Sequence, residues 1–264
     1  MSKHPLQFLE VPRRDPEKEA PEDRVRHFGE IYGHYDSASA AAQAGRCLSC
    51  GNPYCEWKCP VHNYIPNWLA LVEEGKLFEA ADLSHQTNSL PEICGRVCPH
   101  PCEVNCRRGI EDDPVSINQL KRFVADYEMN SGKRLPIACA PDNGKKVAVI
   151  GGGPAGLTNA YFLRRLGHAV TIFDMMPKLG GMIRYGIPEY RLPKETLRWE
   201  IQGILDLGWQ EVTKYRVDPG FYQVDVNVLI NLKKWNSLTP EQQAFLEKMG
   251  TWIESLNAEN AKIN

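Results

Sequence analysis

Two arrays of closely spaced cysteines are the residues of this chain with the clearest chemistry. The first array is Cys47-x2-Cys50-x4-Cys55-x3-Cys59-Pro60, and the second is Cys94-x3-Cys98-x3-Cys102-x3-Cys106. Thiolates two to four residues apart can surround one small inorganic core, and a cysteine followed by proline commonly ligates a neighbouring cluster. Eight thiolates therefore predict two [4Fe-4S] clusters, and with them a role in electron transfer.

Disulfides and structural zinc are the alternative uses of these cysteines. Residues 1–14 are polar and lack the apolar core of a secretory signal, and thiols stay reduced in the cytosol. Zinc sites usually pair two Cys-x2-Cys knuckles, whereas only Cys47 and Cys50 have that spacing. His62 and His100 could replace a thiolate, although we interpret both as ordinary loop residues. Cys139 has no cysteine neighbour and is predicted to be a small buried residue.

A glycine-rich segment, Gly151-Gly152-Gly153-Pro154-Ala155-Gly156, follows the arrays. The apolar run 147–150 predicts a buried parallel strand, residues 157–166 a helix and residues 169–173 a second strand. In such a βαβ unit the glycines permit a tight turn, a close approach to a pyrophosphate and close packing of the helix. Asp174, at the end of the second strand, is expected to accept bonds from a ribose hydroxyl. The segment predicts a dinucleotide site, the alternative being a turn that only connects strand to helix.

Helices are expected on either side of the arrays. Residues 37–44 are rich in alanine and end at Gly45, Pro66 can open a helix, and residues 77–83 continue in helical conformation. Apolar residues from Val115 to Tyr127 recur near the helical period up to a capping Gly132. We therefore predict a helical domain over residues 1–134, completed by its clusters, since ligation supplies folding free energy. Residues 135–144 have the composition of a linker.

Composition narrows the possible functions. The 264 residues are 42% hydrophobic and 24% charged, with a net charge of −2. The near-neutral charge balance offers no basic surface for nucleic acid. The sequence contains no run of eighteen apolar residues, so no membrane span is predicted. Residues 13–30 are dense in mixed charge, which we interpret as a solvated lead-in without chemistry. No catalytic base or nucleophile is predicted, because the clusters and a bound dinucleotide would carry the chemistry.

Residues from about 5 to 207 resemble the N-terminal part of the small subunit of bacterial glutamate synthase, a module also found in dihydropyrimidine dehydrogenase and related iron–sulfur flavoproteins. The resemblance rests on Arg46-Cys47-Leu48-Ser49-Cys50, Cys55, Cys59-Pro60, the segment 88–99 around Cys94 and Cys98, the GGGPAG loop, and Gly180-Gly181 through Arg191-Leu192-Pro193. It implies two [4Fe-4S] clusters beside FAD, with electrons leaving singly to a larger catalytic subunit or another redox partner.

The same resemblance implies which cluster each array cysteine would hold. Cys47, Cys50, Cys55 and Cys106 would hold one cluster, and Cys59, Cys94, Cys98 and Cys102 the other. Relatives can use a side chain from the following helix as the fourth ligand. Lys121 stands near that position, and an ammonium group cannot ligate iron, which favours Cys94. The FAD would contact Gly151, Gly152, Gly153, Pro154, Ala155, Gly156, Asp174, Gly180, Gly181, Met182 and Arg191. The short Cys98-x3-Cys102 spacing leaves the subfamily open.

The chain departs from the family after residue 207. The second glycine-rich domain for NAD(P)H is missing, so NAD(P)H would act only through a domain outside these residues. Alternation over residues 222–230 predicts a strand, and Thr239-Pro240-Glu241-Gln242 predicts the start of a helix. This tail, 208–264, resembles the C-terminal region of TRAP-transporter solute-binding proteins. A fusion or assembly join near 206–208 and a divergent natural tail both remain open.

The expected architecture is an α-helical iron–sulfur domain (1–134), a partial α/β Rossmann-like FAD-binding domain (135–207) and a short α+β tail (208–264). We expect a cytoplasmic electron-transfer subunit that relays electrons between FAD and the clusters. The alternatives are a non-catalytic iron–sulfur adaptor or truncated mosaic chain, and a fragment of a solute-binding protein. Whether the chain turns over alone is left open.

Overall fold

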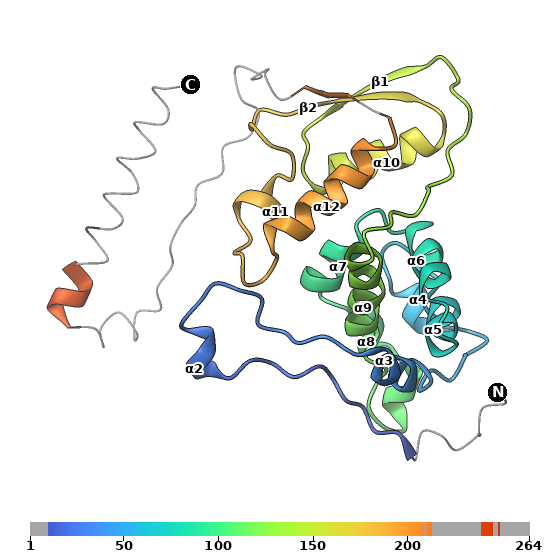
Figure 1. Cartoon of the computed structure of the whole chain (residues 1–264), viewed down its shortest axis with the longest axis vertical. Helices are drawn as coiled ribbons and strands as arrows, with labels where there is room; N and C mark the ends of the chain where they lie inside the picture. The colour runs from blue at the N-terminus through green and yellow to red at the C-terminus, as the bar shows by residue number, and fades with distance from the viewer. Residues whose placement is uncertain (1–9, 209, 213–238, 245–247, 249–264) are drawn as a thin grey trace. The chain divides into compact units, whose positions relative to one another are not determined.

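The computed structural model describes residues 10–208, 210–212, 239–244 and 248. The chain divides into two compact units, Met1–Val217 and Asp218–Asn264. Figure 1 traces the chain and labels its elements. Within the described ranges, no helix is both long enough and apolar enough to cross a membrane.

Helices make up the first part of unit 1. Their bounds are α2 Pro21–Arg24, α3 Ser37–Ala44, α4 Tyr54–Trp57, α5 Ile65–Glu73, α6 Leu77–His85, α7 Pro91–Val97, α8 Pro101–Val104, the 3-10 helix η1 Arg107–Ile110 and α9 Ile117–Asn130. We call residues 37–130 the helical half. The helices predicted from alanine content, Pro66 and the helical period are confirmed as α3, α5, α6 and α9.

Local capping explains several of these bounds. The Asp36 side chain accepts a hydrogen bond from the Ser39 N–H, 2.8 Å long, at the start of α3. Gly75 and Gly132 adopt positive φ angles of 74° and 66° shortly after α5 and α9, a conformation that glycine adopts without strain. The one-turn helices α4 and α8 were not predicted, because four residues are too few to show a period.

The core of the helical half gathers around α5 and α9. Trp68, Leu69 and Val72 from α5 are almost fully buried, as are Leu120 and Val124 from α9. Five cysteines from the two arrays pack against this core or belong to it: Cys47, Cys55, Cys59, Cys102 and Cys106. The cysteine arrays therefore lie on the core and are not confined to surface loops.

A parallel sheet follows, and we call residues 146–212 the sheet half. Its strands are β1 Lys146–Ile150, β2 Ala169–Phe173 and β3 Gln210–Val212, in the order β1-β2-β3. Val147 aligns with Val170 and Ile172 with Glu211. The helices are α10 Pro154–Arg165, α11 Met182–Tyr185 and α12 Lys194–Leu205, and α10 and α12 lie on the same side of the sheet (Figure 1). The predicted βαβ unit is confirmed, and the sheet continues beyond the boundary predicted at residue 207.

The second hydrophobic core belongs mainly to the sheet half. It contains Val149, Leu157, Val170 and Ile172 with Leu197, Ile201 and Ile204 of α12. Leu90, the N-cap of α7 in the helical half, and Ile93 in the first turn of that helix are buried in this same core. One helix of the first half is thus shared with the second.

An N-terminal arm, residues 13–35, runs along the helical half. Its two sides pair through an antiparallel bridge between Lys18 and Tyr32. The Arg13 guanidinium lies 2.9 Å from Glu103, and Glu30 lies 2.8 Å from the buried Arg96. The interpretation of residues 13–30 as a solvated lead-in is therefore wrong at these two positions, because their charges neutralise partners that the sequence places far away.

The described part of unit 2 is the start of a helix. The Thr239 hydroxyl accepts from the Gln242 N–H at 3.3 Å, and the Gln242 side chain accepts from the Thr239 N–H at 2.9 Å. This reciprocal pair is the predicted capping box, which is confirmed. The strand predicted over residues 222–230 lies outside the described residues.

Candidate iron–sulfur and dinucleotide sites

The first predicted ligand set lies around one pocket. Cys47, Cys50, Cys55 and Cys106 all line it, together with apolar side chains that include Leu69. Burial, with smaller contributions from the neighbouring Cys106 and Cys47, raises the pKa of the Cys55 thiol to about 12. Four thiols around an apolar hollow are the donor set that a cubane cluster requires, because the cluster takes thiolate ligands and is stabilised by exclusion of water.

Thiols of the second predicted set influence one another electrostatically. Burial raises the pKa of Cys94 to about 11 and that of Cys102 to about 12. The Lys121 ammonium opposes both shifts, whereas Cys59 and Cys98 add to both. Cys59 and Cys98 therefore lie within electrostatic reach of both Cys94 and Cys102. Lys121 acts on Cys94 and Cys102 as a nearby positive charge.

The two sets approach each other through Cys55 and Cys102. Cys102 is among the groups that raise the pKa of Cys55, although the two belong to different predicted ligand sets. The His100 N–H also donates to Cys98 Sγ over 3.4 Å. No group of three or more Cys, His, Asp or Glu residues in the described ranges lies close enough to hold a single metal ion.

One cysteine prediction is wrong. Cys139 was expected to be buried as a small hydrophobe, but its side chain is exposed in the segment between the halves. The surrounding residues 138–142 are themselves exposed or half-buried, so the alanine neighbours do not indicate a core position. His62 and His100 occupy loops with positive φ angles of 45° and 41°, which agrees with their interpretation as loop residues.

The glycine loop lies between β1 and α10. Gly151 has a φ of 97°, and its N–H donates to the Phe173 carbonyl at 2.7 Å. A Cβ on Gly156 would collide with the Gly151 carbonyl oxygen, and one on Gly181 would lie 2.8 Å from the Gly153 Cα. The backbone of the second glycine pair thus packs directly on the loop. The loop leads into the first turn of α10, and the N–H groups of a helix's first turn are the donors that the predicted pyrophosphate would use.

Asp174 is turned towards this loop. Its carboxylate accepts hydrogen bonds from the N–H groups of Gly152 and Met176, the latter 2.7 Å long. The side chain is 7% exposed. The acid therefore fixes the glycine loop to the end of β2, a role that the sequence motif did not reveal, and its remaining acceptor capacity is what a ribose hydroxyl would use.

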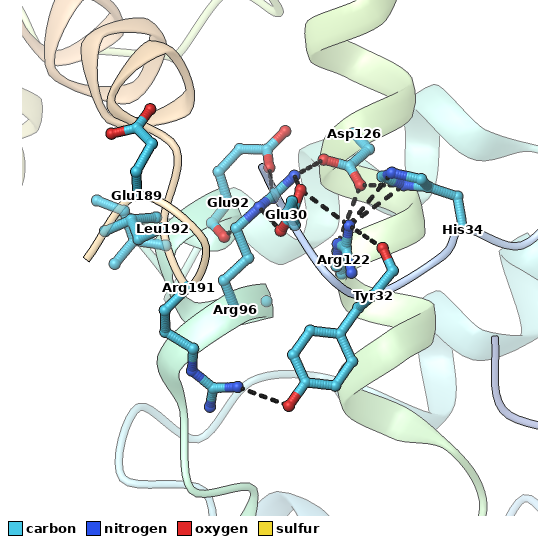
Figure 2. Close-up of polar contacts among 12 residues, drawn as sticks. Glu30, Tyr32, His34, Glu92, Arg96, Arg122, Asp126, Glu189, Arg191 and Leu192 are labelled. Carbon is cyan, nitrogen blue, oxygen red and sulfur yellow. Dashed lines mark hydrogen bonds and ion pairs between the residues drawn. The ribbon is translucent and has the colours of Figure 1, made fainter. Parts of the chain in front are cut away.

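The other predicted FAD contacts lie at the start of α10 and in the segment before α12. Pro154 begins α10 and Ala155 follows it, both exposed, while Met182 at the start of α11 is 63% exposed. Arg191 donates to the Tyr32 hydroxyl at 3.1 Å and lies over its ring (Figure 2). The N-terminal arm thereby holds an arginine of the sheet half.

A network of buried charges adjoins Tyr32. Arg96 of α7 forms ion pairs with Glu92, Asp126 and Glu30, the last two at 2.6 and 2.8 Å (Figure 2). Burial alone would raise the pKa of Asp126, but His34, Arg96 and Arg122 together lower it to about 2. Asp126 is therefore ionised at neutral pH and joins α9 to α7.

Glu200 of α12 was missed by the sequence reasoning. It is buried, and its two oxygens accept from the N–H groups of Glu92 and Ile93 at 2.6 and 3.1 Å. Burial raises its pKa to about 8 in spite of these bonds. The sequence of an amphipathic helix does not show which groups the carboxylate of a single acid will contact.

Two family models match the chain in the same order as its halves. Residues 24–133 match the model described as dihydropyrimidine dehydrogenase domain II, 4Fe-4S cluster. Residues 149–214 match the model described as NAD(P)-binding Rossmann-like domain. The chain therefore carries an iron–sulfur domain followed by a Rossmann-like dinucleotide-binding domain.

Several proteins similar in sequence to this chain are glutamate synthase small chains. The chain is 50% identical over 199 residues to the glutamate synthase [NADPH] small chain of Escherichia coli, covering 75% of this chain and 42% of that one. It is 51% identical over 194 residues to the small chain of Halomonas elongata, covering 73% and 41%. For Mycobacterium tuberculosis the identity is 40% over 228 residues, covering 86% and 45%. The predicted resemblance to the glutamate synthase small subunit is confirmed, and the chain spans less than half the length of these relatives.

Proposed function

We propose that this chain is the cluster-bearing and flavin-binding part of a cytoplasmic electron-transfer subunit of the glutamate synthase small-chain type. The observation that supports the proposal most directly is the pocket that Cys47, Cys50, Cys55 and Cys106 line, within the same compact unit as the other four array cysteines and the glycine loop. The comparisons support the iron–sulfur and Rossmann-like assignments over the same residues.

The residues present fit both cofactors. Cys47, Cys50, Cys55 and Cys106 would hold one [4Fe-4S] cluster, with Cys59, Cys94, Cys98 and Cys102 holding the other. The loop 151–156, Asp174, Gly180, Gly181, Met182 and Arg191 would hold FAD. When bound, the flavin exchanges electrons in pairs and the clusters pass them singly. The chain's own contribution is to hold these groups in one compact unit.

A larger partner subunit completes the proposal. The relatives are named small chains, which supports a larger subunit as electron acceptor. NAD(P)H would deliver electrons through a domain outside the 264 residues. The matches to the two family models, over residues 24–133 and 149–214, do not favour the solute-binding alternative.

Cofactor content tests the proposal directly. Protein purified without oxygen should contain about eight irons per chain, the number that two cubanes require, and one FAD. Its visible absorption should disappear on acid treatment. Zinc without iron would overturn the proposal, whereas iron without flavin would establish the adaptor alternative in its place.

A further inference from the structure

Helix α7 connects the two halves of the molecule. By sequence it belongs to the helical half, where it carries Cys94. By packing it also belongs to the sheet half, because Leu90 and Ile93 are buried in the core that contains Leu197 and Ile201 of α12. The position of Cys94 is therefore set by both halves.

The start of α7 is capped from α12. The first turn of any helix has N–H groups without partners inside the helix, and Leu90 at the N-cap position offers no side-chain acceptor. The two oxygens of Glu200 accept from the Glu92 and Ile93 N–H groups, at 2.6 and 3.1 Å. These donors immediately precede Cys94, and the carboxyl that satisfies them comes from the sheet half.

The opposite side of α7 is held by α9. A Cβ on Gly95 would lie 2.9 Å from the Cα of Arg122, so the two backbones are in contact. The Asn118 side-chain amide donates to the Gly95 carbonyl at 2.8 Å. With α9 against one side and Glu200 at its first turn, α7 has little freedom to shift, and Cys94 keeps a fixed place.

We propose that Glu200 is a positioning residue for Cys94, and that assembly of the second cluster therefore depends on the sheet half. The inference rests on the proposed function, because it assumes that Cys94 is a ligand. Glu200 itself does not touch the cluster in this proposal. It acts by keeping the Cys94 backbone where the thiol can meet Cys59, Cys98 and Cys102.

Substitution of Glu200 separates this role from ordinary packing. E200A removes both acceptors. E200Q keeps the size of the side chain and one acceptor oxygen, while its amide nitrogen cannot accept the second N–H. E128Q is the matched control, because Glu128 is also buried and accepts from the Leu135 N–H at 3.0 Å, but its partners lie outside α7.

The variants should be purified as holoproteins without oxygen and measured for iron and by EPR. We expect E200A to hold about half the iron of the unsubstituted chain, that is about four atoms in place of eight, with the signal of the first cluster retained. E200Q, which keeps the fold, should keep both clusters when isolated but should lose iron from the second on mild oxidation, giving the EPR signal of a three-iron cluster. E128Q should match the unsubstituted chain in both measurements.

Three outcomes would overturn the inference. They are full and stable iron in both Glu200 variants, equal losses in E128Q, or simultaneous loss of both clusters in a folded E200Q. If E200A does not fold, E200Q alone decides. Absence of iron from the unsubstituted holoprotein would instead overturn the proposed function, so the two failures are distinct.

Discussion

Glycine 156 has the least room of the glycines in the dinucleotide loop. Because the colliding atom is the backbone oxygen of Gly151, no side-chain rotation can relieve a Cβ at this position. We expect G156A to lower the free energy of unfolding, measured in urea, by roughly 1–3 kcal/mol, as at other overpacked sites. The variant should also lose FAD. N159A, at an exposed position on the same helix, should keep both properties. Normal flavin content in G156A would contradict the assignment of the loop.

The raised pKa of Glu200 predicts how stability depends on pH. The unfolded glutamate titrates near its ordinary 4.5, whereas the folded one titrates near 8. Between these values the folded chain holds a proton that the unfolded chain has released. The stabilisation is therefore complete below about pH 4.5 and is lost as the pH rises through 8, by at most about 1.4 kcal/mol per pH unit.

This pH dependence should be carried by Glu200. Melting temperatures between pH 5 and 8 should fall in the unsubstituted chain and fall less steeply in E200Q, since glutamine has no proton to release. Other titrating groups contribute equally to both proteins. Parallel curves would show that Glu200 is ionised in the folded state, contrary to the effect of its burial.

At the scale of elements, Arg96 holds three segments through charge. It joins Glu92 on its own helix α7, Asp126 on α9 and Glu30 on the arm. R96M should leave these buried carboxylates partly uncompensated and cost about 3–5 kcal/mol in urea unfolding. R26M removes the exposed Arg26–Asp23 pair and should cost less than about 1 kcal/mol. A similar loss in both variants would mean that the buried network contributes little.

Periodic elements were predictable, and contacts between distant elements were not. Local sequence is enough to recognise the alanine run of α3, the apolar stripe of α9 and the strand–glycine–helix order of β1 and α10. Helix α12 was missed as an element, although its Leu197, Ile201 and Ile204 are buried at helical spacing. The candidate ligands could be predicted because cysteine spacing is local. The cap from Glu200 and the contact between Tyr32 and Arg191 could not, since 107 and 159 residues separate the partners.

At the scale of the whole molecule, the cysteine sets should be separable. C47S removes a proposed ligand of the first cluster and C98S one of the second, so each variant should retain about four irons in place of eight. Each should also melt earlier, because ligation contributes to folding. C139S is the control, since that thiol is exposed and lies apart from both sets in the proposal. Equal iron in C47S and C139S would remove Cys47 from the ligand set.

The sharing of α7 between two cores has a consequence for modularity. A break in the exposed segment near residue 139 looks like a natural place to exchange one half for that of another protein. Such a chimaera would bury Leu90 and Ile93 against a foreign surface. We expect grafts that cut there to succeed only when the donor and recipient carry compatible faces for this one short helix, so the two halves would have to be inherited together.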